Sequence, residues 1–227
     1  MTVLGLDSSG AAASVGIYKD GKVIVSYTLN HERTHSEKLM EMVDNALNIA
    51  RMEIKDIDSF AITVGPGSFT GIRIGTACVK GLAAVGSKPV YPVSYLDSLY
   101  EAVNCGGELP VCVTVDAGRG EVYYAVYEGG RKLGEDSYAD ASALASELSL
   151  KYEKMLFTGD GVLKYGDVIR EGFKNALLAE KEFLFGSGAS VIKAALEFSK
   201  AVPPEMISPV YLKKSQAERM KEKENGK

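Results

Sequence analysis

Near its beginning the chain reads Val3-Leu4-Gly5-Leu6-Asp7-Ser8-Ser9-Gly10, a short apolar run that ends in an acidic loop. A second apolar run follows at residues 13–18, and Asp20-Gly21 separates it from a third at residues 23–29. An Asp-Gly pair between apolar runs is a strong signal for a β-hairpin. The opening of the chain therefore predicts three strands, with Asp7 at the end of the first.

The same pattern returns in the second half of the chain. An apolar run at residues 111–115 leads into Asp116-Ala117-Gly118-Arg119-Gly120, and another run at residues 121–127 reaches a Gly129-Gly130 turn. A further apolar run ends in Gly159-Asp160-Gly161. This repetition predicts an α/β protein with two similar lobes on either side of a cleft.

Two helices are expected in the first lobe. Thr34 and Glu37 match a capping box, in which each side chain bonds the other residue's backbone N–H, and apolar residues then recur at helical spacing to residue 51. A strand at residues 57–64 ends at Gly65-Pro66-Gly67-Ser68, because such a turn cannot stay in a sheet. A second helix, unusually rich in glycine and alanine, is expected from about residue 69 to residue 85.

A short strand and a third helix complete the first lobe. The strand is expected at residues 89–93, and Ser94 with Asp97 is expected to cap the helix that runs to Val103. A loop with Gly and Pro follows at residues 104–110 and is the best lobe boundary. We therefore expect an N-terminal lobe over residues 1–106, a C-terminal lobe over residues 107–212 and a charged tail over residues 213–227.

The composition narrows the class of protein. The 227 residues carry a formal net charge of -4, which disfavours unaided binding to nucleic acid because phosphate contacts need clustered Lys and Arg. Three cysteines at irregular spacing indicate neither a disulfide framework nor a cysteine metal site. The N-terminus has no signal-peptide pattern, and no apolar run approaches the ~20 residues that span a bilayer. We therefore expect a cytoplasmic protein without a membrane partner.

The paired aspartate loops are the first candidate site. In a two-lobed protein they could face each other, so that backbone N–H groups bind phosphate oxygens and the carboxylates order a magnesium ion. The alternative is that the aspartates only cap turns. The candidate nucleotide cleft consists of Asp7, Ser8, Ser9, Asp116, Gly118, Gly159, Asp160 and Gly161.

Two further motifs are weaker. His31-Glu32-Arg33-Thr34-His35 has the H-E-x-x-H form of zinc proteases, but the expected helix begins only at Thr34 and a third histidine is lacking, so no metal site is predicted. Residues 65–71 resemble a phosphate loop, yet lack the Gly-Lys-Ser/Thr of a Walker A motif. Tight strand–helix packing and an anion site both remain open for that loop.

The first two helices are the second candidate site. Their apolar surface exceeds one buried stripe, and the second places Gly71 and Gly75 four residues apart, which permits close approach of another helix. Side by side they could form a four-helix bundle with an equivalent pair, while the alternative is that both are simply core. The candidate partner-binding residues are Leu39, Met40, Val43, Leu47, Gly71, Ile74, Gly75 and Cys78.

Several motifs together resemble the TsaB (YeaZ) family. They are L-G-L-D-S-S at Asp7, H-S-E-K-L at His35, V-G-P-G-S-F-T-G-I-R-I-G at residues 64–75, D-A-G-R-G-E-V-Y at residues 116–123, T-G-D-G at Gly159 and P-V-Y-L near Tyr211. The glycine-rich block is the most specific of these. Two positions depart from the family pattern. Gly120 stands where the family usually has a basic residue, and Lys213 stands where it usually has Arg.

The resemblance implies a fold and a role. The fold is the duplicated actin/Hsp70/sugar-kinase-like (ribonuclease H-like) arrangement. The role is that of a non-catalytic activator in tRNA threonylcarbamoyladenosine synthesis, which binds a TsaD-like subunit, works with a TsaE-like ATPase, forms a homodimer when alone and meets tRNA only indirectly. No catalytic residue is expected. No cofactor should bind tightly, although ATP or ADP with magnesium can bind in the partner-containing complex.

TsaD itself carries an H-x-x-x-H metal pair at a strand-to-helix step. The corresponding step here, Pro92-Val93-Ser94-Tyr95-Leu96-Asp97, has no histidine.

Two functions are the alternatives to this activator role. One is an independent ATP-binding transferase that uses Asp7 and Asp116, and the other is a zinc metalloprotease that uses His31 and His35.

Overall fold

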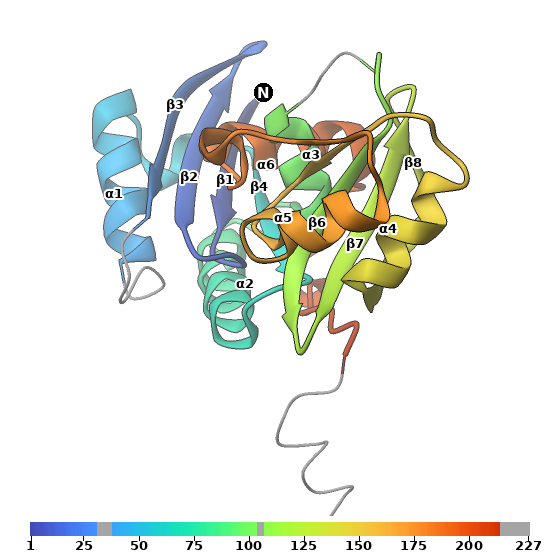
Figure 1. Cartoon of the computed structure of the whole chain (residues 1–227). Helices are drawn as coiled ribbons and strands as arrows, with labels where there is room; N and C mark the ends of the chain where they lie inside the picture. Colours follow the sequence, from blue (N-terminus) through green and yellow to red (C-terminus); the bar gives the residue numbers. More distant parts are fainter. Residues whose placement is uncertain (31–37, 104–106, 214–227) are drawn as a thin grey trace, which may run out of the picture.

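The computed structural model describes residues 1–30, 38–103 and 107–213 (Figure 1). The two halves of the chain have the same order of elements. The first half contains β1 (Thr2–Asp7), β2 (Ala13–Lys19), β3 (Lys22–Leu29), α1 (Leu39–Ala50), β4 (Ser59–Gly65), α2 (Phe69–Ala84), β5 (Val90–Ser94) and α3 (Tyr95–Val103). The second contains β6 (Val111–Gly118), β7 (Glu121–Glu128), β8 (Arg131–Asp140), α4 (Ala141–Ser149), β9 (Met155–Thr158), α5 (Gly161–Gly172), β10 (Ala176–Leu178) and α6 (Gly188–Phe198).

Each half builds one five-stranded mixed sheet. The strand orders are β3-β2-β1-β4-β5 and β10-β9-β6-β7-β8, so the second sheet repeats the first. In both sheets the first three strands are antiparallel and the later strands pair in parallel. The predicted α/β fold with two similar lobes is confirmed.

The predicted hairpin at the start of the chain is confirmed as well. Asp20 and Gly21 join β2 to β3 and both have positive φ, at 48° and 92°. This is the backbone geometry of the tight turn that Asp-Gly favours. The first helix begins at Leu39 in the described chain, and the predicted capping box of Thr34 and Glu37 lies outside the described residues.

The cap predicted for α3 differs from the structure. Ser94 Oγ accepts a hydrogen bond from the backbone N–H of Leu96 at 3.1 Å. Asp97 does not return to the cap, because its side chain is buried against the second lobe, where it accepts from Tyr127 Oη at 2.6 Å and pairs with Lys132 at 2.8 Å. This aspartate therefore anchors α3 to the second sheet.

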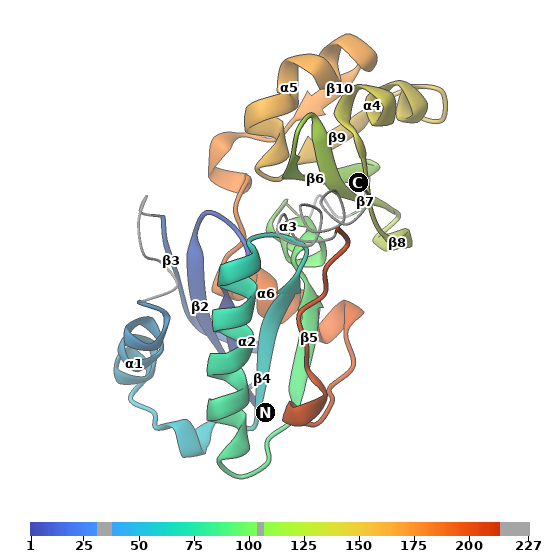
Figure 2. The same ribbon diagram turned by 90° about the horizontal axis from the view of Figure 1, so that it is seen from below.

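The two halves exchange their third helices. α1 and α2 cover one face of the first sheet, but its other face is covered by α6, whose Val191 and Ile192 pack against Val3 and Ala61. In the second sheet, α4 and α5 cover one face and α3 covers the other (Figure 2). The two sheets come from separate halves of the chain, which meet near residues 106 and 107. Each sheet nevertheless needs a helix from the other half.

The close approach of α6 to the first sheet depends on glycine. A Cβ atom on Gly188 would lie 2.1 Å from the backbone carbon of Val15, and one on Gly16 would lie 2.6 Å from that of Gly188. These separations are too short for any side chain. Among the described residues, no helix has the length and apolar character needed to cross a membrane.

The last described residues return across both lobes. Val202 forms an isolated bridge with Val90 at the free edge of β5, and Ile207 is buried in the core of the first lobe. Val210 N–H donates to the carbonyl of Val64 at 2.7 Å. Lys213 then reaches the β6–β7 hairpin, where it donates to the carbonyl of Ala117 at 3.0 Å. We call residues 202–213 the C-terminal strap; residues 214–227 lie outside the described part.

Candidate functional site

The first aspartate loop is closed and internally satisfied. Asp7 is buried, and its Oδ1 accepts from Ser9 N–H at 2.8 Å and from Thr63 Oγ1 at 2.5 Å. Ser9 Oγ donates in turn to Thr63 Oγ1 at 2.8 Å, and Ser8 Oγ donates to the carbonyl of Gly71 at 2.8 Å. Burial raises the pKa of Asp7 to about 6, although these hydrogen bonds oppose the shift.

The glycine-rich block packs directly on this loop. A Cβ on Gly67 would lie 2.2 Å from the carbonyl oxygen of Ser9, one on Gly71 2.0 Å from that of Ser8, and one on Gly75 2.3 Å from Ser8 Oγ. Ser68 N–H also donates to the carbonyl of Ser9 at 2.7 Å. Of the two interpretations left open for residues 65–71, the contacts favour tight strand–helix packing.

The second aspartate loop is more open. Asp116 is exposed; its Oδ2 pairs with Lys164 Nζ at 2.8 Å and its Oδ1 accepts from Tyr165 Oη at 2.8 Å and from Gly118 N–H at 2.8 Å. Partial burial acts to raise its pKa, but these donors bring the pKa below its ordinary value. Its backbone N–H donates to Asp160 Oδ1 at 3.1 Å, and burial raises the pKa of Asp160 to about 6.

The two glycines beside Asp160 again serve close packing. Gly159 has a φ of 88°, and a Cβ there would lie 2.3 Å from the carbonyl oxygen of Thr114. A Cβ on Gly161 would lie 2.9 Å from Thr114 Oγ1. The structure therefore brings the candidate residues of the second lobe together around a packed turn.

Tyr95, which the sequence reasoning missed, lies between the two loops. It is 1% exposed, and the pKa of its hydroxyl is raised first by burial and then by the charges of Asp7 and Asp160. Gly10 and Gly186 leave room for it: a Cβ on Gly10 would lie 2.1 Å from Tyr95 Oη. The tyrosine ring is thus buried near the carboxylates of both Asp7 and Asp160.

No metal centre is formed by the described residues. Within residues 1–30, 38–103 and 107–213, no three His, Cys, Asp or Glu side chains are placed to hold a metal ion. His31 and His35 of the H-E-x-x-H motif lie outside these ranges. At the strand-to-helix step considered for metal binding, Ser94 Oγ donates to Asp136 Oδ2 at 2.6 Å and the next residue is the buried Tyr95.

The predicted partner-binding residues divide into two groups. Leu39, Val43 and Leu47 are at most 8% exposed and belong to the first lobe's own core, because the helical stripe that they form faces the sheet. Gly71 and Gly75 are also buried, against the Asp7 loop. These five residues lie in the interior of the first lobe, so the prediction that they contact a partner directly does not fit their burial.

The remaining three predicted residues do reach the surface. Met40 is 38% exposed on α1, while Ile74 and Cys78 are half-buried on α2. Two exposed small residues, Ala77 and Gly81, lie on α2 beside them. Apart from its own helix, none of the described residues has an atom within 4 Å of where a Cβ on Gly81 would be, so packing within the described chain gives no reason for this glycine.

Three of the motif blocks meet at one place. Phe69 and Tyr211 stack with ring centroids 4.6 Å apart, and the guanidinium of Arg73 lies 3.8 Å above Phe69 and donates to Tyr211 Oη at 2.8 Å. Lys213 is nearly buried and pairs with Glu121. The side chains of these motifs fasten the C-terminal strap to both lobes.

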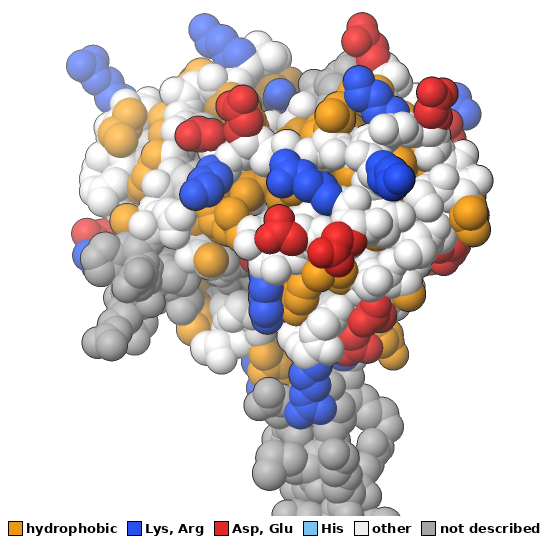
Figure 3. Space-filling view, viewed as in Figure 1, with side chains coloured by type: hydrophobic (Ala, Val, Ile, Leu, Met, Phe, Trp, Pro, Cys, Tyr) orange, Lys and Arg blue, Asp and Glu red, His pale blue; other side chains and the backbone are white. Residues whose placement is uncertain are grey.

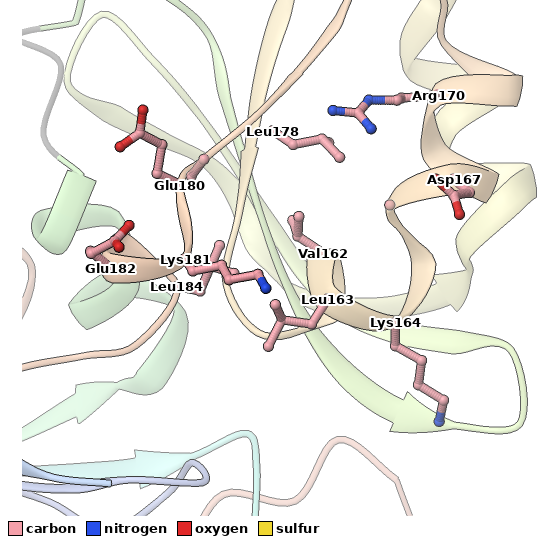
Figure 4. Close-up of a pocket in the computed structure, with 12 residues that line it drawn as sticks. Val162, Leu163, Lys164, Asp167, Arg170, Leu178, Glu180, Lys181, Glu182 and Leu184 are labelled. Carbon is pink, nitrogen blue, oxygen red and sulfur yellow. The ribbon is translucent and has the colours of Figure 1, made fainter.

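The second lobe has a separate cavity of about 560 Å³ between α5 and β10 (Figure 4). Val162, Leu163 and Leu178 form its apolar wall, and the surrounding charges are balanced in sign. They are Lys164, Asp167, Arg170, Glu180, Lys181 and Glu182. Such a lining has no preference for a strongly charged ligand.

Comparisons with known proteins agree with this architecture. A family model described as TsaD, tRNA N6-adenosine threonylcarbamoyltransferase, matches residues 23–223. The tRNA threonylcarbamoyladenosine biosynthesis protein TsaB of Escherichia coli strain K12 is 30% identical over 226 residues, which cover 96% of each chain. Among solved structures, YeaZ from Pseudomonas aeruginosa has a TM-score of 0.76 at 28% identity and covers 93% of this chain and 99% of its own.

A sugar kinase shares the fold at greater distance. The ROK hexokinase from Thermus thermophilus has a TM-score of 0.52 at 14% identity, and the match covers 87% of this chain and 99% of the kinase. This similarity concerns the fold alone. The predicted two-lobed, sugar-kinase-like architecture is confirmed.

Proposed function

Since the chain belongs to the TsaB family, we propose that it acts in tRNA threonylcarbamoyladenosine biosynthesis as a non-catalytic subunit that binds and activates a TsaD-type partner. The observation that carries this proposal is the burial of the Asp7 loop. Asp7 is buried, its Oδ1 accepts from Ser9 N–H and Thr63 Oγ1, and the buried Tyr95 lies near it. A chain that keeps the fold but buries this carboxylate is better suited to support chemistry than to perform it.

The same geometry argues against tight nucleotide binding. A phosphate group on the Asp7 loop would need free backbone N–H groups, but Ser9 N–H is bonded to Asp7. The glycine-rich block packs directly against Ser8 and Ser9 of this loop. The Asp7 loop is therefore poorly suited to hold a phosphate group. We assign ATP or ADP with magnesium to the partner-containing complex and not to this chain alone.

The surface proposed for the TsaD-type partner lies on α2 and the neighbouring side of α1. Ile74 and Cys78 supply apolar contact, and Ala77 and Gly81 allow a second helix to approach closely. Glycine inside a helix costs up to ~1 kcal/mol against alanine, so Gly81 needs a reason outside the folded chain. Met40 on α1 extends this surface.

The tRNA and a TsaE-like ATPase are the other members proposed for this assembly. The net charge of -4 gives no strong attraction for a phosphate backbone, so tRNA contact is assigned mainly to the partner. A TsaE-like ATPase would join the larger complex after this heterodimer forms.

The proposal is tested by placing a charge on the exposed face of α2. Ala77→Glu should abolish co-purification with a TsaD-type subunit without lowering the melting temperature, because Ala77 is exposed in the isolated chain. Ala143→Glu on the surface of α4 is the matched control and should leave binding unchanged. Retained binding by Ala77→Glu, or ATP turnover by the isolated chain, would contradict the proposal.

A further inference from the structure

Exposed aromatic side chains gather at one end of the molecule. Four aromatic residues of the described chain are at least 36% exposed: Phe69, Tyr138, Phe183 and Tyr211. Phe69 and Tyr211 stack on each other, and the ring of Tyr138 has its centroid 5.3 Å from the ammonium group of Lys213. Three of these four rings therefore surround the last residues of the C-terminal strap.

Positively charged side chains lie between and beside these rings. Arg73 is exposed, and its guanidinium lies 3.8 Å from the ring centroid of Phe69 and 5.8 Å from that of Tyr211. Lys213 connects the strap to the β6–β7 hairpin, and Arg119 is exposed at the tip of that hairpin. In Figure 3, blue and orange side chains lie together at the lower edge of the molecule, near the grey tail. The strap-end surface, as we call it, consists of Phe69, Arg73, Arg119, Tyr138 and Tyr211.

Arg119 occupies its position against its backbone preference. The turn between β6 and β7 consists of Arg119 and Gly120, whose φ angles are 61° and 87°. Such a turn favours Asn, Asp or Gly at its first position, because a left-handed backbone crowds the Cβ atom of other residues. Among the residues that the structure describes, the Arg119 side chain has no hydrogen bond or ion pair. Fastening of the strap therefore explains Phe69 and Tyr211, but not this arginine.

The acidic side chains near this surface are already engaged. Glu121 pairs with Lys213. Asp116 pairs with Lys164, and Asp140 accepts from two backbone N–H groups at the start of α4, each at 3.0 Å. Within the described ranges neither arginine of the strap-end surface pairs with a carboxylate, so both leave a positive charge there. Residues 213–227 add six Lys and Arg against three Glu, so the net charge of -4 is unevenly distributed along the chain.

We propose that the strap-end surface binds a single-stranded stretch of RNA, with its arginines on phosphate groups and its exposed tyrosine rings on the bases. Cations interleaved with aromatic rings are the chemistry that recognises single strands, since every nucleotide offers a phosphate and the flat face of a base. An acidic protein segment would use the cations alone. The exposure of Tyr138 and Tyr211 beside them favours RNA as the occupant.

This inference rests on the proposed function, because a tRNA substrate supplies single-stranded loops. Arg73 lies four residues before Ala77 on α2, so the two side chains share one face of the helix. The strap-end surface therefore borders the face proposed for the TsaD-type partner. RNA bound here would continue onto the subunit to which the chemistry is assigned, and its main contacts would remain with that subunit.

The test uses the isolated full chain and a fluorescein-labelled single-stranded RNA of about ten nucleotides. Fluorescence anisotropy gives Kd over a range of salt concentrations. Arg119→Asn should raise Kd about threefold to tenfold and reduce the slope of log Kd against log salt by about 0.7, since one phosphate contact is lost. The same change should raise the melting temperature, because Asn-Gly suits this turn better. A purely structural role would not combine a more stable fold with weaker binding.

Two matched controls separate this surface from the rest of the chain. Arg51, at the end of α1, is also exposed and also has a positive φ, of 54°, so Arg51→Asn should leave Kd and the salt slope unchanged. For the rings, Tyr138→Leu should raise Kd at least about fivefold through lost stacking. Phe183→Leu removes a ring that is 48% exposed, close to the 46% of Tyr138, and should have no effect.

Three results would overturn the proposal. The first is a wild-type chain that binds no RNA at ~50 mM salt, or binds it no better than Arg119→Asn does. The second is polyglutamate that competes as well as unlabelled RNA, because the surface would then suit an acidic protein. The third is loss of co-purification with a TsaD-type subunit in Arg119→Asn, which we expect to retain it. Since RNA binding is measured without that subunit, a failure of the proposed function is told apart from a failure of this surface.

Discussion

At the scale of single residues, the two repeated aspartates have diverged in environment. Asp7 is buried without a cation, and burial raises its pKa to about 6. Asp116 is held at the surface by Lys164, and its pKa lies below the ordinary value. Equivalent positions in the duplicated fold thus carry opposite electrostatic effects. One carboxylate disfavours folding when it is ionised, whereas the other favours it.

Asp7→Asn should stabilise the chain at about pH 8. A folded-state pKa of about 6 against an unfolded value near ~3.9 means that stability falls as pH rises between these values, and above pH ~6 the full penalty of about 3 kcal/mol is present. The asparagine can still accept from Ser9 and Thr63. Urea unfolding at about pH 8 and pH 4 should show a gain at the higher pH only.

Asp116→Asn is the control for this prediction and should have the opposite sign. Its lowered pKa adds stability above the unfolded value, so the substitution should lower stability at about pH 8. Equal effects of Asp7→Asn at both pH values would contradict the role given to burial.

At the scale of elements, α2 contains glycines with two different purposes. Gly71 and Gly75 allow the helix to touch the Asp7 loop, and any Cβ there would overlap Ser8. A Cβ added at Gly81 would meet no atom within 4 Å in the part of the chain that the structure describes, its own helix aside. The same residue type in one helix therefore serves internal packing at one end and an exposed surface at the other. A charge at Gly75 would test folding and not partner binding.

Gly81→Ala should stabilise the isolated chain by about 0.5–1 kcal/mol, since alanine loses less backbone entropy in a helix and meets no neighbour. Gly75→Ala should destabilise it by about 1–3 kcal/mol, because a Cβ would lie 2.3 Å from Ser8 Oγ and 3.0 Å from Ile62 Cδ1. Both free energies are measured by urea unfolding. If both substitutions changed the free energy of unfolding in the same direction, the two purposes assigned to these glycines would be contradicted.

The local sequence patterns predict the helices and strands of the first lobe better than they predict the contacts between them. The Asp20-Gly21 turn and the glycine-rich block identify strands and helices because their signals lie within a few residues. β8, α4 and α5 were not predicted, since β8 is charged along its length and lacks clear alternation.

The sequence predicts which residues belong to the candidate site, but not whether they are buried or exposed. The sequence patterns identify Asp7 and Asp160, but not the buried Tyr95, whose hydroxyl pKa is raised by burial and by the charges of both carboxylates. Similarly, an apolar stripe such as Leu39, Val43 and Leu47 does not reveal whether it faces the chain's own sheet or a partner. These questions are settled only by tertiary contacts.

At the scale of the whole molecule, the C-terminal strap connects the lobes a third time. The chain itself crosses between them after α3 and before α6, and the strap adds a side-chain contact through Lys213 to Glu121 and Ala117. Lys213 also lies 5.8 Å and 5.3 Å from the ring centroids of Tyr123 and Tyr138. One nearly buried lysine near the end of the described chain therefore adds to the contacts that join the lobes.

Lys213→Met should loosen this connection. We expect a loss of about 1–2 kcal/mol in unfolding free energy, since Glu121 and a carbonyl oxygen lose their donor. Hydrogen exchange should rise in the β6–β7 hairpin and near Val210. Lys193→Met, at an exposed position of α6, is the control and should change neither. Unchanged exchange in the hairpin would show that the lobes do not need the strap.

The exchange of α3 and α6 has a consequence for each half as a separate chain. Each half carries strands and two helices for one face of its sheet, but the helix over the other face comes from the opposite half. Either half alone would leave one apolar sheet face exposed to water, so neither half should fold when expressed alone.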